Sequence, residues 1–267
     1  MDKETINSFY FSGVEKTRLL PGHSELEGIR TKEIVSRYLP DNLIKIIDVG
    51  GATGFYSFWL KSLGHHVTLV DLSQDHISWA KEYSLQNQIS LDAYEVGDAT
   101  SLQFEDNQFD MALLLGPLYH LIDRTDRINA ISEAKRVLRP NGIIISAVIS
   151  RYASLIDGLH RNLIADPQFV KILNKDLENA IHINPTDNPE YFTTSYFHTP
   201  DEIESEILEC DLQLEKLIAV ESLGWLSDFS SANERNTNLV LDLLRRVETN
   251  RDLLASSPHI LAIARKQ

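Results

Sequence analysis

A glycine-rich turn and a later aspartate have the spacing of a site for a ribose-bearing ligand. Residues 48–54 read Asp-Val-Gly-Gly-Ala-Thr-Gly and follow a run of apolar, mostly β-branched residues. A glycine turn between a buried strand and a helix lets the backbone approach a ligand at the carboxyl edge of a parallel sheet. Asp71 lies about 20 residues further on, at the end of the next apolar run, where its carboxylate can accept hydrogen bonds from both ribose hydroxyls.

The glycine pattern argues against the common nucleotide sites. A dinucleotide fingerprint that starts at Gly50 needs glycines where the sequence has Ala52 and Phe55, and no phosphate-binding Gly-Lys-Ser/Thr loop occurs. Asp48 would repel a pyrophosphate but suits a cationic ligand. S-Adenosylmethionine carries a sulfonium and an ammonium group and no phosphate, so it fits this turn. The alternative is that Asp48 and Asp71 only cap helices or lie in exposed turns.

Together with later motifs, this turn resembles the first motif of the class I S-adenosylmethionine-dependent methyltransferases. The further matches are Gly-Asp-Ala at 97–99, Leu-Gly-Pro-Leu-Tyr-His at 115–120 and Val-Leu-Arg-Pro-Asn-Gly at 137–142. The resemblance covers residues 43–150 and, more loosely, the last two predicted strands. It departs from the family at Ala52, where many members have glycine.

The resemblance implies a set of cofactor-binding residues. Asp71 would hold the ribose, Asp98 would meet the adenine amino group, and Arg18, in a segment folded over the cofactor, would pair with the methionine carboxylate. A solvated surface arginine is the alternative for Arg18. The full set is Arg18, Asp48, Gly50, Gly51, Ala52, Thr53, Gly54, Asp71, Leu72, Gly97, Asp98, Ala99, Leu115, Gly116 and Tyr119. No metal ligands are predicted.

Candidates for acceptor chemistry are fewer, because methyl transfer needs a base only when the acceptor must lose a proton. His120 follows the fourth predicted strand and can take up a proton; local packing is the alternative. Tyr196 and His198 belong to an aromatic cluster at 191–198 and alternate with Phe197, so an extended segment would turn them together toward the acceptor and Phe197 inward. Ordinary packing of this segment is equally compatible with the sequence.

The elements that position these residues alternate between strands and helices. Strands are predicted at 43–49, 66–71, 91–96, 111–115, 143–149, 214–220 and 259–264, and helices at 55–63, from Ser73 to Tyr83 and at 128–138. This order is typical of an α/β fold with a doubly wound, seven-stranded, mostly parallel sheet.

Residues 151–200 are too long for a plain connection between strands and are predicted to form a helical lid after strand five. We therefore expect four parts: an N-terminal segment with a lead-in helix at 1–40, a cofactor-binding core at 41–150, an acceptor-binding lid at 151–200, and completion of the sheet at 201–267.

The amino-acid composition limits the kinds of partner that the protein is expected to bind. The formal net charge of −14, from 39 acidic and 25 basic residues, disfavours nucleic acid and anionic membranes. The single cysteine, Cys210, excludes an intrachain disulfide, and the absence of a signal-like or spanning apolar run fits a cytoplasmic protein. The sequence does not indicate an oligomeric state.

The sequence thus predicts an S-adenosylmethionine-dependent methyltransferase acting at oxygen, nitrogen or carbon of a small molecule. Two alternatives stay open. One is a methyltransferase for protein or RNA, of which RNA is disfavoured by the acidic balance. The other is a module that binds the cofactor without turnover.

Overall fold

The computed structural model describes residues 25–186, 188–227 and 234–267. By its contacts the chain divides into two compact units, which we describe separately. Among the described residues, the core unit comprises 35–147, 204–215 and 262–267, and the second unit comprises 25–34, 148–186, 188–203, 216–227 and 234–261. None of the helices in the described ranges combines the length and apolar composition that a bilayer crossing requires.

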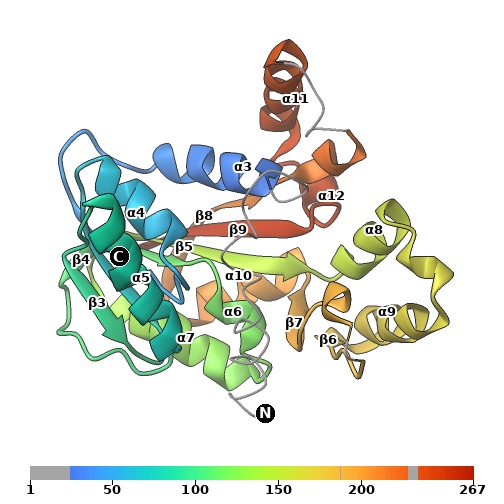
Figure 1. The fold of residues 1–267 in the computed structure, drawn as a ribbon, viewed down its shortest axis with the longest axis horizontal. Helices are drawn as coiled ribbons and strands as arrows, with labels where there is room; N and C mark the ends of the chain where they lie inside the picture. Colours follow the sequence, from blue (N-terminus) through green and yellow to red (C-terminus); the bar gives the residue numbers. More distant parts are fainter. Residues whose placement is uncertain (1–24, 187, 228–233) are drawn as a thin grey trace. The chain divides into compact units, whose positions relative to one another are not determined.

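The core unit contains the parallel strands that the sequence predicts (Figure 1). Their bounds are β1 Lys45–Val49, β2 His66–Asp71, β3 Ala93–Val96 and β4 Phe109–Leu114, followed by β5 Leu138–Ser150, which continues into the second unit. β1 pairs in parallel with both β2 and β4, β2 with β3, and β4 with β5. Ile46 and Ile47 have opposite side-chain directions and are both completely buried, as expected of a central strand covered on both faces.

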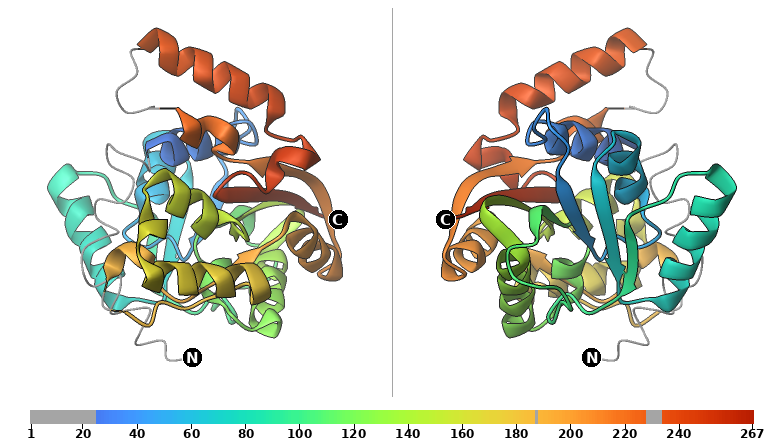
Figure 2. Two further views of the ribbon diagram at one scale, coloured as in Figure 1. Left: turned by 90° about the vertical axis from the view of Figure 1, so that its right-hand side faces the viewer. Right: turned by 90° about the vertical axis from the view of Figure 1, so that its left-hand side faces the viewer.

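The helices of the core unit follow these strands in turn. They are α4 Phe55–Ser62, α5 Gln74–Asn87, α6 Pro117–His120 and α7 Arg124–Val137. Ser73 caps α5 as predicted, since its hydroxyl accepts a hydrogen bond from the His76 amide. In both views of Figure 2, α5 and α7 lie on opposite sides of the parallel strands. This arrangement confirms the doubly wound fold.

The second unit departs most from the sequence prediction. Its elements, some of which continue into the core unit, are α3 Glu25–Ser36, α8 Ala153–His160, α9 Pro167–Asn179, β6 Ile181–His182, β7 Ser195–His198, α10 Pro200–Glu209, β8 Leu212–Ala219, α11 Glu234–Val247, α12 Arg251–Leu254 and β9 His259–Lys266, with short 3₁₀ turns at Leu163–Ala165, Pro189–Tyr191 and Ser222–Leu226. α8 and α9 pack side by side (Figures 1 and 2).

The insertion at 151–200 is therefore not purely helical. β7 pairs in parallel with the end of β5, joining Phe197 to Ile149 and His198 to Ser150, and β6 pairs antiparallel with β7. The described sheet has nine strands, in the order β3-β2-β1-β4-β5-β7-β6, with β9 paired to β5 and β8. The seven strands β3-β2-β1-β4-β5-β9-β8 are those of the predicted fold. β6 and β7 were not predicted as strands, because β6 has only two residues and β7 obtains its hydrogen-bond partners from β5, which is distant in sequence.

Residues 139–142, between the predicted helix at 128–138 and the predicted strand at 143–149, belong to the strand. β5 begins at Leu138, directly after α7, and pairs with Phe109 before the register shifts so that Ile143 faces Met111. Asn141 has a φ of 66°, in the left-handed region that asparagine tolerates. The segment is therefore a bulge within a longer strand, since a bulge accommodates extra residues without ending the pairing.

A buried polar network holds the insertion together. The Asp176 Oδ2 atom accepts a hydrogen bond from the Ser154 hydroxyl at 2.5 Å and lies 2.8 Å from His182 Nδ1. The opposite ring nitrogen of His182 donates to the carbonyl oxygen of Tyr191 at 2.6 Å, because a carbonyl can only accept. These contacts form a buried hydrogen-bonded network that links α9, β6 and the turn at Pro189–Tyr191.

We expect His182→Leu to lower the free energy of unfolding by about 1–3 kcal/mol, because it removes the hydrogen-bond partner of the buried Asp176 side chain and of the Tyr191 carbonyl. Urea unfolding followed by circular dichroism measures this loss. The double variant with Asp176→Leu should lose less than the sum of the two single variants. Additive losses would show that the two side chains do not form an energetically coupled pair.

Candidate functional site

The glycine turn joins β1 to α4 and lies in direct backbone contact with the loop after β4. The Gly50 amide donates to the Val70 carbonyl at 2.8 Å, and Gly50 has a φ of 68°. A Cβ atom placed on Gly50 would lie 2.6 Å from Pro117 Cγ, and one on Gly116 would lie 2.8 Å from the Gly50 carbonyl oxygen. Glycine is therefore required at both positions, because any side chain would separate the two loops.

The carboxylate of Asp71 fastens this turn to the end of β2. Its Oδ2 atom accepts from the Ala52 amide at 2.8 Å, and its Oδ1 atom accepts from the Ser73 amide at 2.9 Å and lies 3.0 Å from His76 Nδ1. Sequence reasoning gave Asp71 a ligand-binding role and missed both this anchoring role and His76. A carboxylate accepts about four hydrogen bonds, so Asp71 retains capacity for a ligand hydroxyl.

Asp48, at the end of β1, is a buried carboxylate with an unsatisfied oxygen. Only 1% of the residue is exposed. Its Oδ2 atom accepts from the Ser57 hydroxyl at 2.6 Å, while Oδ1 has no hydrogen-bond partner among the described residues. Burial raises the pKa of Asp48 to about 6, the nearby negative charge of Asp71 adds to this rise, and the hydrogen bond from Ser57 opposes it. A cationic ligand group would satisfy this oxygen.

The remaining predicted cofactor residues of the core unit lie on the loops that follow β2, β3 and β4. The Gly97 amide donates to the Asp71 carbonyl at 3.0 Å, so the β3 loop adjoins the end of β2. Asp98 Oδ1 accepts from the amide and hydroxyl of Thr100 at 2.9 and 2.8 Å. The Leu72 side chain, directly after Asp71, is 38% exposed. An exposed apolar side chain therefore lies next to the carboxylate of Asp71, and ligand sites commonly combine apolar and polar groups in this way.

The other predicted positions in these loops are placed as follows. Thr53 is buried, Ala99 and Leu115 are half-buried, and Gly51 packs so closely that a Cβ atom there would lie 2.6 Å from Asp48 Oδ2. The Tyr119 hydroxyl donates to the Leu115 carbonyl at 3.3 Å. Gly54 begins α4 with a φ of 87°. Arg18 lies outside the described residues, so its predicted role stays a prediction.

The acceptor-side candidates fall in both units. His120 belongs to α6 of the core unit, and its ring stands edge-on to Tyr119 with centroids 4.6 Å apart. Tyr196 and His198 lie on β7 of the second unit with rings 4.7 Å apart, so they share a face as the alternation predicted. The Tyr196 hydroxyl donates to Glu202 Oε1 at 2.9 Å.

Two side chains of β7, Phe197 and His198, are buried. Phe197 packs inward as predicted and stacks on His182, with centroids 5.0 Å apart. His198 is completely buried in this structure, although the sequence placed it on an acceptor surface. His198 lies opposite Ser150 of β5, in a strand pairing that the sequence did not reveal.

Comparisons with known proteins agree with this geometry. A family described as "Methyltransferase domain" matches residues 47–146. The O-antigen chain terminator bifunctional methyltransferase/kinase of Escherichia coli is 24% identical over 200 residues, which cover 66% of this chain and 27% of that protein. The ubiquinone biosynthesis O-methyltransferase of Bartonella tribocorum is 32% identical over 113 residues, covering 42% of this chain and 44% of that protein. The chain thus matches less than half the length of these two relatives.

Among solved structures, a protein from Methanosarcina mazei described as a SAM-dependent methyltransferase superposes with a TM-score of 0.60. It is 21% identical, and the match covers 87% of this chain and 96% of that one. At this identity the likeness shows the fold alone.

The raised pKa of Asp48 predicts a pH dependence of stability. Because the folded value of about 6 exceeds the ordinary value of 3.8, protonated Asp48 stabilises the fold below about pH 4, and this contribution is lost as the pH rises through 6. Two pKa units correspond to roughly 3 kcal/mol. Between pH 4 and 6, therefore, the stability of wild type should fall relative to that of Asp48→Asn, measured by urea unfolding. Parallel pH profiles would contradict the buried, ionisable state of Asp48.

Ala52 offers a second prediction. It adopts a φ of 49°, a left-handed conformation that costs an alanine about 1–2 kcal/mol but costs glycine little. Ala52→Gly should therefore raise the melting temperature, with a net gain of up to about 1 kcal/mol after the greater chain entropy of glycine is counted. The control is Ala80→Gly in the interior of α5, which should destabilise by at least about 1 kcal/mol. A loss in both variants would refute the assignment of strain to Ala52.

Proposed function

Because the chain belongs to the class I S-adenosylmethionine-dependent methyltransferases, we propose that it transfers the methyl group of S-adenosylmethionine to a small-molecule acceptor. The observation that carries this proposal is the buried Asp48 carboxylate beside a glycine turn that lacks the dinucleotide pattern. A buried carboxylate with an unsatisfied oxygen favours a ligand that brings positive charge and disfavours one that brings phosphates.

The residues present fit such a cofactor. Asp48 would pair with a cationic group of the methionyl portion. Asp71 would accept a further hydrogen bond from a ribose hydroxyl. Leu72 would supply an apolar surface for the adenine base. Asp98 would accept a hydrogen bond from the adenine amino group. When bound, S-adenosylmethionine supplies an electrophilic methyl group on a positively charged sulfur. The chain has to bind and orient the cofactor and the acceptor for in-line transfer.

For the acceptor we propose a small molecule. The net charge of −14 disfavours RNA, and the curated relatives include enzymes named for ubiquinone biosynthesis. His120 is the proposed base for acceptors that must lose a proton, because it ends α6, the short helix after β4 that Gly116 precedes and that also carries Tyr119. Tyr196 and His198 remain acceptor-side candidates. Tyr196 donates a hydrogen bond to Glu202 and His198 is completely buried, so the role we propose for both is to position the acceptor-side segment.

The proposal predicts that the protein binds S-adenosylhomocysteine and not NAD in calorimetric titrations. Asp48→Asn should weaken S-adenosylhomocysteine binding by about 1.5–3 kcal/mol, or roughly 10- to 100-fold, because a charge-assisted contact is lost. The matched control is Asp75→Asn, an exposed carboxylate of the first turn of α5, which should bind as wild type does. Preference for NAD, or equal affinities of the two variants, would overturn the cofactor assignment.

A further inference from the structure

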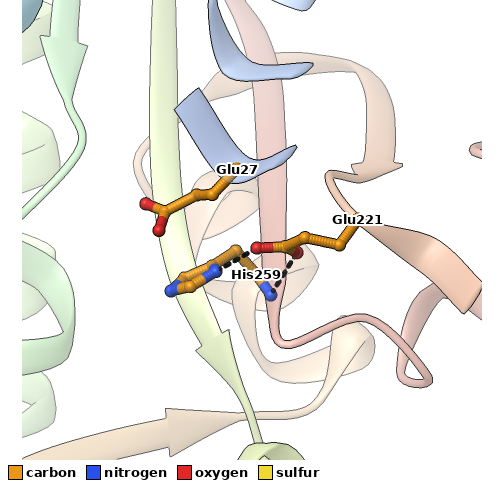
Figure 3. A group of neighbouring side chains, drawn as sticks. All are labelled: Glu27, Glu221 and His259. Carbon is orange, nitrogen blue, oxygen red and sulfur yellow. Dashed lines mark hydrogen bonds and ion pairs between the residues drawn. The ribbon is translucent and has the colours of Figure 1, made fainter. Parts of the chain in front are cut away.

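Three side chains with metal-ligating atoms converge in the second unit, outside the proposed cofactor site (Figure 3). Glu27 comes from α3, Glu221 follows β8, and His259 begins β9. One ligand atom from each residue lies within 4.8 Å of the others. Nothing in the linear sequence joins them, since the segments are widely separated, and the sequence analysis accordingly predicted no metal ligands.

The Glu221 carboxylate is held in a fixed orientation. Its Oε1 atom lies 2.6 Å from His259 Nδ1, and its Oε2 atom accepts from the Ser257 hydroxyl at 2.8 Å and from the His259 amide at 3.1 Å. The same hydroxyl oxygen accepts from the amides of Glu221 and Ser222, both at 3.0 Å. Metal sites use such outer contacts to orient their ligands before the ion arrives.

The cluster is shielded from solvent. Glu221 is only 5% exposed, and its carboxylate lies against His259 and Ser257. Arg30, one turn after Glu27 on α3, directs its guanidinium to Glu33 and Glu248 and to the Val220 carbonyl. Those bonds commit the positive charge of Arg30 to other acceptors.

We propose that Glu27, Glu221 and His259 bind a divalent transition-metal ion. One imidazole nitrogen and two carboxylates suit Zn²⁺, Mn²⁺ or Co²⁺, whereas Mg²⁺ and Ca²⁺ prefer ligand sets made of oxygen alone. Bonds of about 2.0–2.2 Å place neighbouring ligands some 3.4 Å apart in a tetrahedral site, a separation these side chains reach by small movements. The ion would join α3, β8 and β9 within the second unit, and its coordination by His259 would release any proton held on the ligating nitrogen.

The experiment is a calorimetric titration of chelator-treated full-length protein with Zn²⁺, in parallel with Mg²⁺. We expect one Zn²⁺ per chain, a higher melting temperature with Zn²⁺, no comparable effect of Mg²⁺, and proton release seen as a dependence on buffer ionisation enthalpy. Co²⁺ substitution provides a spectroscopic readout of nitrogen ligation. No nucleoside is present, so the outcome is independent of the proposed methyl transfer.

Two variants and one control make the result specific. Glu27→Gln and His259→Gln should each weaken Zn²⁺ binding by roughly 10- to 100-fold. His66→Gln alters a histidine–carboxylate pair on the surface, with Asp92, and should bind as wild type does. Circular dichroism before metal addition identifies a variant that fails to fold. If His259→Gln fails to fold, the test of the proposal is Glu27→Gln, which leaves the Glu221–His259 contact intact. Absence of stoichiometric binding by wild type, or equal binding by Glu27→Gln and His66→Gln, would overturn the proposal.

Discussion

The interaction on which the core unit depends is the carboxylate of Asp71 at the end of β2. It accepts from the amides of Ala52 and Ser73, and so fixes both the glycine turn after β1 and the start of α5. Parallel strands leave their carboxyl-terminal backbone groups at one edge, where loops must find partners outside the sheet. A single buried acceptor that serves two loops meets this need and sets the shape of the edge that the proposed cofactor would contact.

Stability and binding oppose each other at Asp48. A carboxylate that is buried with one unsatisfied oxygen destabilises the unliganded fold, as its pKa of about 6 records. The same oxygen gains most from a cationic ligand, because a desolvated charge interacts strongly with an opposite one. Ala52 adds to this pattern, since the turn also keeps a strained backbone conformation. A local loss of folding stability of this kind is typical of binding sites.

In the second unit, buried histidine–carboxylate contacts tie the elements together. Asp176 and His182 link α9 to β6, and Glu221 and His259 link the end of β8 to the start of β9. Such contacts add little net stability compared with apolar packing, but they penalise alternative arrangements in which one polar group would stay buried without a partner. This unit therefore depends on specific polar pairing, whereas β1 and the strands beside it depend mainly on apolar burial.

The sequence alone determined the central fold and the cofactor loops, because apolar runs, the glycine turn of 48–54 and Asp71 are local signals with a fixed period or spacing. Apart from the start of β5, the predicted strands and helices of the core unit agree with the structure to within a few residues. Only the tertiary structure decided the rest. β7 is a strand because β5 supplies its hydrogen-bond partners, and the cluster of Glu27, Glu221 and His259 exists because three distant segments meet. Both facts arise from long-range contacts, and the local sequence does not reveal which distant segments will meet.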